Sequence, residues 1–395
     1  MTRTRGGRYD RVWQAGFLVG SALGVAATVV GRRMERSARR GLIDWPAAER
    51  FAEGRLRHAP GALSAAELRD TEPAYAQTMA RIVPRLSAAL GTELPGVVGR
   101  SGVVDRAGWV RANSASFAAL IGRLEGTLLD QILPPGGGIG QASVALANRW
   151  IATRQIGFML GFMGARVLGQ YDLALLSAET TPGRLLFVEE NIRQTASTLG
   201  VPLDAFRTWI ALHETTHAFE FEAHPWLRPY LADRLERQLA AFSSGTKGVA
   251  PEMLRRVGRA LRGDGSGEHW MERLMSAEQR RLFRETQAVM SLLEGFSDYI
   301  MDEVGRDLVP DVELISERFH ARREQRRSGF ERAIMRLTGM DMKLDQYKKG
   351  ERFVAAIAAR GGQPALDRLW SGPESLPRDG EIEAPERWLA RVLAA

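Results

Sequence analysis

Helical periodicity dominates the pattern of hydrophobic and polar residues along the chain. In most segments apolar residues recur every three or four positions, which is typical of helices with one buried face. The segments expected to be helical span residues 44–59, 66–90, 141–169, 204–223 and 291–305. The best strand candidate is a short apolar run at 183–192, which follows Pro182-Gly183. The pattern therefore predicts a mainly α protein with at most a small β-sheet.

A different pattern occupies residues 12–31, which carry no charge and are flanked by arginines. Twenty helical residues extend over roughly 30 Å, the thickness of a bilayer core. Gly16, Gly20 and Gly24 would line one face of such a helix, which favours helix–helix self-association in a membrane. We therefore predict that residues 1–40 form a single membrane-spanning tether and that 41–395 form the catalytic body.

The distribution of arginines around this segment favours a cytoplasmic location for the body of the protein, because more arginines follow the span than precede it. The alternative is a soluble cytoplasmic protein in which residues 12–31 form a buried helix.

The distribution of charge and the absence of cysteine exclude several kinds of function. The formal net charge of +7 belongs to residues 1–40, which hold nine arginines and two acidic residues. The remaining chain balances 45 basic against 45 acidic side chains, so its body has no net field to attract nucleic acid. No disulfide or thiolate metal site can form without cysteine. A metal site must therefore use histidine, aspartate or glutamate.

The stretch WIALHETTHAFEFEAHPW at 209–226 contains a His-Glu-x-x-His motif. His213 and His217 lie one helical turn apart, about 6 Å along the axis, so both imidazoles can reach one metal ion. Both are expected on the same inward stripe as Trp209. Glu214 could take a proton from an attacking water as general base. The alternative is a pair of core histidines beside a solvent-facing glutamate.

Two positions compete for the third metal ligand. Glu294 and Asp298 are four residues apart, which places both carboxylates on one helix face. This segment resembles the third-ligand helix of the gluzincins, in which the glutamate binds zinc and the aspartate orients a ligand histidine. The alternative is a solvated Glu–Asp face. His224 is the other candidate ligand, although a continued helix would carry it about 10 Å too far along the axis.

Several motifs together resemble one family of uncharacterised bacterial proteins. These motifs are TWIALHETTHAFEF (208–221), SLLEGFSDYIMDEVG (291–305), KLDQYKKGERFV (343–354) and LWSGPESLP (369–377). The family carries the description of zincin-like, zinc-dependent metallopeptidases, or of hydrolases associated with the biosynthesis of a deazaflavin coenzyme. The resemblance covers roughly residues 41–395. It implies an α-rich zincin-like fold with His213, Glu214 and His217 in the metal motif and Zn²⁺ as the cofactor.

The leading functional interpretation is a zinc metallohydrolase that cleaves a peptide or a small amide. A donor for the developing oxyanion would also be needed, and the candidates are Tyr299, His320 and Tyr347. One alternative is a membrane-tethered helical scaffold, or an inactive zincin, with a structural zinc. Another is a small-amide hydrolase of coenzyme biosynthesis, which would share the site and differ in its substrate.

Overall fold

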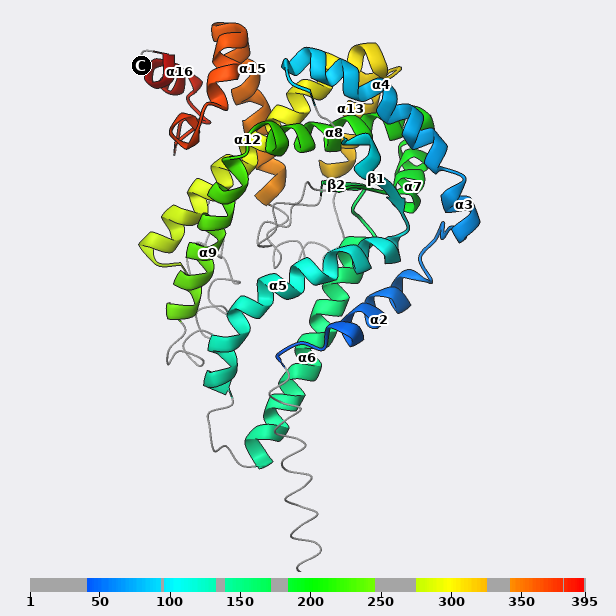
Figure 1. Ribbon diagram of the computed structural model, residues 1–395, viewed down its shortest axis with the longest axis vertical. Helices are drawn as coiled ribbons and strands as arrows, with labels where there is room; N and C mark the ends of the chain where they lie inside the picture. The colour runs from blue at the N-terminus through cyan, green and yellow to red at the C-terminus, as the bar shows by residue number, and fades with distance from the viewer. Residues whose placement is uncertain are drawn as a thin grey trace, which may run out of the picture. The chain divides into compact units, whose positions relative to one another are not determined.

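The computed structural model describes residues 41–93, 96–132, 139–171, 184–245, 275–324, 342–378 and 380–393. Within these residues the protein is mainly helical with one small sheet, as the periodicity predicts (Figure 1). The chain divides into two compact units, residues 1–55 with 117–162 and residues 56–116 with 163–395. The candidate metal ligands all belong to the second unit.

The helices of the described residues carry the labels of Figure 1. They are α2 (Trp45–Leu56), α3 (Ala65–Arg69), α4 (Glu72–Leu90), α5 (Arg106–Ile132), α6 (Ile139–Gly164), α7 (Glu189–Leu199), α8 (Leu203–Ala223), α9 (Leu227–Gly245), α12 (Ala277–Leu308), α13 (Val312–Glu324), α15 (Met342–Leu369) and α16 (Pro385–Leu393).

The predicted helix 66–90 is divided into α3 and α4. Pro73 lies in the first turn of α4, where its missing N–H costs nothing and its fixed φ favours a helix start. α3 is capped by Ser64, whose side chain accepts the N–H of Glu67. A proline that starts a new helix therefore accounts for the break.

In the first unit, α2 packs closely against α6. A Cβ on Gly157 of α6 would lie 2.7 Å from the Ala48 carbonyl oxygen, so only glycine fits this contact. The N–H of Asp44 donates to Thr153 Oγ1 at 2.9 Å, which anchors the start of α2 on α6.

In the second unit, α8 is the central helix, with α4 and α12 packed against it (Figure 1). The apolar core around it includes Phe206 and Trp209 of α8 and Phe319 of α13, whose rings contact one another. α12 in turn packs along α15. α12 is therefore held between α8 and α15, and this packing fixes the position of Glu294 opposite α8.

The sheet has the strand order β1-β3-β2, formed by β1 (Ser101–Val104), β3 (Leu185–Val188) and β2 (Gly169–Tyr171). β3 runs parallel to β1 and antiparallel to β2. All four residues of β3 are buried, and β2 packs against α8. The strand predicted at 183–192 is thus confirmed only for 185–188. Helix α7 begins at Glu189, because two acidic residues in its first turn favour the positive end of the helix dipole.

The prediction of a transmembrane helix is wrong for the part of the chain that the structure describes. From Trp45 to Leu393, no described helix combines the length and the apolar character needed to cross a bilayer. The predicted tether at 12–31, with Gly16, Gly20 and Gly24, lies outside the described residues.

Candidate metal centre

Helix α8 carries the His-Glu-x-x-His motif through the interior of the second unit. It begins at Leu203, directly after Pro202, and ends at Ala223, because Pro225 disfavours helical dihedrals at His224. Buried residues occur on all sides of α8, so it has no single apolar stripe of the kind predicted. The histidines keep 15% of their side-chain surface exposed, and they face α12.

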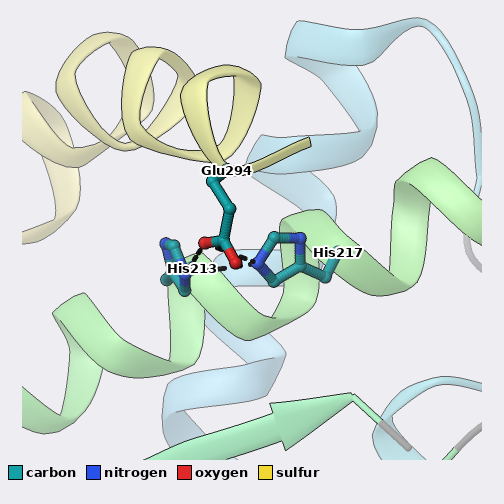
Figure 2. Close-up of side chains that lie close together, drawn as sticks. All are labelled: His213, His217 and Glu294. Carbon is teal, nitrogen blue, oxygen red and sulfur yellow. Dashed lines mark hydrogen bonds and ion pairs between the residues drawn. The ribbon is translucent and has the colours of Figure 1, made fainter. Parts of the chain in front are cut away.

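His213, His217 and Glu294 converge on one point, with the carboxylate of Glu294 lying between the two imidazoles (Figure 2). The two histidine Nε2 atoms are 3.2 Å apart. Glu294 Oε2 lies 3.6 Å from Nε2 of His213 and 3.7 Å from Nε2 of His217. Ligand atoms about 2 Å from a tetrahedral zinc are roughly 3.3 Å from one another. The spacing of these three atoms therefore suits a zinc ion.

The two histidines differ in what contacts their second ring nitrogen. His217 Nδ1 lies 2.8 Å from Glu220 Oε2 and 3.2 Å from Ser297 Oγ. His213 Nδ1 lies 3.0 Å from the sulfur of Met301 and 3.8 Å from Asp298 Oδ1. Asp298 thus lies near His213 but beyond hydrogen-bond distance of it, and its role in orienting a ligand histidine stays a prediction.

Sequence reasoning missed the contact between Glu220 and His217. The available signal was their spacing, since residues three apart on a helix are neighbours on its surface. The same spacing also occurs in solvent-facing pairs. The sequence alone therefore does not distinguish a buried contact between histidine and glutamate from an exposed one.

Glu214 is covered by the edge strand β2. The N–H of Tyr171 donates to its carboxylate, and a Cβ on Gly169 would lie 2.6 Å from Glu214 Cγ. Burial raises the pKa of Glu214 to about 7; His217 opposes this rise and Glu294 adds to it. A carboxyl group with this pKa can both accept and release a proton near neutral pH.

Burial and mutual contacts set the pKa values of the other groups in the site. Burial raises the pKa of Glu220 to about 7, against the opposing effect of His217. Burial alone would lower the pKa of His217, but Glu220 and Glu294 hold it well above its usual value. Burial alone would raise the pKa of Glu294, but its contacts with both histidines hold it well below its usual value. The imidazoles and carboxylates thus stabilise each other's charged forms.

His224, the alternative ligand, lies outside the group formed by His213, His217 and Glu294. Its ring stacks on Trp370, with ring centroids 5.0 Å apart, and packs edge-on against Phe219. Burial lowers its pKa to about 4. His224 also lines a cavity of about 320 Å³, together with Tyr299. His224 therefore packs in an aromatic cluster, because it follows the last residue of α8 and lies outside the helix that carries the metal motif.

Of the three candidate oxyanion donors, the structure describes the side chains of Tyr299 and His320, and neither belongs to the group of His213, His217 and Glu294. Tyr299 follows Glu294 by five residues, which places it about 140° around α12 from that ligand. His320 lies on α13, where it contacts Phe319 and Ser316. Tyr347 falls within α15, and its side chain lies outside the described residues. The assignment of an oxyanion donor stays a prediction.

Comparison with known proteins identifies a family and a similar solved structure. A family model described as zincin-like metallopeptidase matches residues 43–389. Among solved structures, the chain is similar to a protein from Chloroflexus aurantiacus that is provisionally described as a hydrolase with a novel fold. The two share 34% identity with a TM-score of 0.64, and the match covers 89% of this chain and 99% of the other. None of the curated proteins compared with the chain matches it.

The family match and the similar solved structure together support a metallohydrolase as the class of protein. The chain belongs to the family of zincin-like metallopeptidases, as the sequence motifs indicate. Membership of this family implies a metal, typically zinc, and the His–His–Glu group of α8 and α12 could bind it.

Proposed function

We propose that this protein is a zinc-dependent hydrolase of peptide or related amide bonds, with His213, His217 and Glu294 as the zinc ligands. The convergence of two Nε2 atoms and one carboxylate oxygen from α8 and α12 carries this proposal. Two histidines and one glutamate form a known ligand set of catalytic zinc, which leaves one coordination position for water or substrate.

The donor chemistry of the site fits zinc for a second reason. Glu214, Glu220 and Glu294 are all largely buried and lie within one cluster. Among the described residues, the groups that shift the pKa values of these carboxylates include histidines, carboxylates, Ser297 and the Tyr171 N–H, but no arginine or lysine. A divalent cation would supply the positive charge that the cluster lacks.

In the proposed mechanism Glu214 is the general base. When bound, zinc polarises the scissile carbonyl and lowers the pKa of the attacking water. Glu214 takes a proton from that water and passes it to the leaving amine. The N–H of Tyr171 and the close contact with Gly169 hold its carboxylate on the β2 side of α8. Because β2 covers it, Glu214 is largely shielded from bulk water.

The variant Glu214→Gln tests this function on the full chain. It removes the base and keeps the shape of the side chain, so zinc content by plasma mass spectrometry should remain near one per chain. Cleavage of a panel of quenched-fluorescence peptides and N-acyl amides should fall by about 100-fold or more. The matched control is Glu381→Gln, which alters a buried carboxylate paired with Arg391 rather than with the metal motif.

Two results would contradict the proposal. A zinc-loaded wild-type protein that cleaves none of these substrates would favour a structural zinc in a helical scaffold. Retained hydrolysis in Glu214→Gln would show that another group is the base. If the wild type cleaves the N-acyl amides and none of the peptides, its substrates are small amides rather than peptides.

A further inference from the structure

Glu220 is the carboxylate most fully removed from solvent in the site. It has no exposed surface, and its Oε2 lies 2.8 Å from Nδ1 of His217, three residues earlier on α8. Ser297 of α12 lies 3.2 Å from the same Nδ1 and donates to Glu220 Oε1 at 3.5 Å. Both oxygens of Glu220 are therefore directed to groups inside the site.

The contacts of Glu220 exclude it as a zinc ligand in this arrangement. Its carboxylate contacts the Nδ1 side of the His217 ring, whereas His213 and Glu294 face the Nε2 side. A carboxylate on Nδ1 selects the tautomer in which Nδ1 carries the proton and Nε2 offers its lone pair.

Asp298 lies farther from Nδ1 of His213 than Glu220 lies from Nδ1 of His217. The Nδ1 of His213 faces the Met301 sulfur, and Asp298 Oδ1 is 3.8 Å away. A thioether is a weak acceptor and carries no charge. Glu220 therefore contacts its histidine more closely than Asp298 contacts His213.

We propose that Glu220 is the positioning residue of the metal centre. It orients His217 and raises the basicity of its Nε2, which extends the functional motif to His-Glu-x-x-His-x-x-Glu. This inference rests on the proposed function, because it assumes that His217 binds zinc. When a divalent cation is bound, the carboxylate of Glu220 would also help to balance its charge in this buried site.

Zinc affinity tests the role of Glu220 without any measurement of catalysis. The full chain would be titrated with zinc in competition with a chromophoric chelator. Glu220→Gln keeps an acceptor but loses the charge, so the Kd should rise about 10-fold, and Glu220→Ala should approach 100-fold. Asp298→Asn should change the Kd less than Glu220→Gln does. Glu381→Gln, the buried-carboxylate control, should leave it within about 2-fold.

Cobalt substitution supplies a readout that a purely structural role would not move. The visible absorption of Co²⁺ in the site should shift in Glu220→Gln and stay unchanged in Glu381→Gln, while circular dichroism confirms that both are folded. If Glu220→Ala fails to fold, the isosteric Glu220→Gln still decides the outcome.

The outcomes separate this inference from the proposed function. A wild-type Kd and cobalt spectrum in Glu220→Gln, or a larger effect from Asp298→Asn, would overturn the role of Glu220 alone. Weakened zinc binding in Glu220→Gln, with no amide cleaved by the wild type, would support Glu220 and overturn the hydrolase. A wild-type chain that binds no zinc would overturn both.

Discussion

Two buried clusters of charged residues in the second unit differ in how their charge is balanced. We call the first the paired cluster; it consists of Arg106, Glu189, Glu190 and Arg207. We call the second the metal cluster; it consists of His213, Glu214, His217, Glu220 and Glu294. Both include residues of α8, but only the first contains arginines.

In the paired cluster each carboxylate has cationic partners. Glu189 is fully buried, pairs with Arg207, and accepts from Tyr75 Oη at 2.8 Å and from Arg193 Nε at 2.7 Å. Glu190 Oε2 lies 3.8 Å from Arg106 Nε and accepts the backbone N–H of the same residue at 3.0 Å. Two buried arginines thus offset two buried glutamates.

In the metal cluster three carboxylates share two imidazoles. The pKa values of Glu214 and Glu220 rise to about 7, chiefly because burial disfavours their charge. The paired cluster balances its charges with fixed partners, whereas the metal cluster has more carboxylates than imidazoles, which is the charge balance expected of a site that binds a cation. This difference distinguishes a structural network from a candidate metal centre.

The largest expected effect comes from breaking the paired cluster. Glu189→Gln leaves Arg207 buried without its main counter-charge, so the free energy of unfolding should fall by about 3–5 kcal/mol. Urea unfolding would measure this, and the loss should be the same with and without zinc. The control Asp307→Asn removes an exposed ion pair with Arg85, and it should cost less than about 1 kcal/mol. A loss that zinc abolishes would mean that the clusters are not independent.

Zinc should stabilise the protein through the metal cluster alone. At free zinc about 1,000 times the Kd, the free energy of unfolding should rise by roughly 4 kcal/mol. Glu294→Ala removes a ligand and should abolish this gain, whereas Glu189→Gln should retain it. Thermal unfolding at several zinc concentrations would measure the gain, and an undiminished gain in Glu294→Ala would refute its assignment as a ligand.

Glu214→Gln should stabilise the metal-free protein at pH 8 and not at pH 4.5. The pKa of Glu214 is about 7 when folded, against 4.5 in its ordinary state, so the folded chain holds a proton that the unfolded chain releases. As pH rises from 4.5 to 7, this group therefore costs the folded state about 3 kcal/mol, which glutamine avoids. Chelator-treated protein unfolded in urea at both pH values would measure the difference. Equal stability at pH 8 would mean that Glu214 ionises freely there.

The smallest effect should come from the packing that positions Glu294. A Cβ on Gly350 of α15 would overlap the Ser291 carbonyl of α12, so Gly350→Ala should cost about 2 kcal/mol and weaken zinc binding as α12 shifts. Urea unfolding and zinc titration would measure both effects. Gly54→Ala is the control, because a Cβ there meets nothing within 4 Å. Unchanged zinc binding in Gly350→Ala would show that α12 and Glu294 tolerate the displacement.

Local patterns predicted a large part of the fold and of the candidate site. The helix 204–223 was placed within one residue of its observed bounds, because periodicity and Pro225 are local signals. Glu294 was predicted from a motif 77 residues beyond His217, and the structure places it against both histidines. The bounds of the short sheet were harder to predict, since only four residues of the predicted strand pair with neighbouring strands.

Other features depend on packing that no single segment encodes. The burial of α8 on all sides requires α4, α12 and β2, which come from distant parts of the chain. Asp298 was expected to orient a ligand histidine, and it lies 3.8 Å from Nδ1 of His213. Glu220 lies closer to the other histidine, 2.8 Å from Nδ1 of His217, because that nitrogen faces a residue of its own helix.

The sequence by itself determined that His213 and His217 lie one turn apart with Glu214 beside them, because helix geometry relates residues that are close in the chain. Only the tertiary structure decided that Glu294 lies between the imidazoles, that β2 covers Glu214, and that Glu220 faces His217. The physical reason is that burial and charge balance depend on which distant segments pack together, and these properties turn a pair of helical histidines into a candidate metal centre.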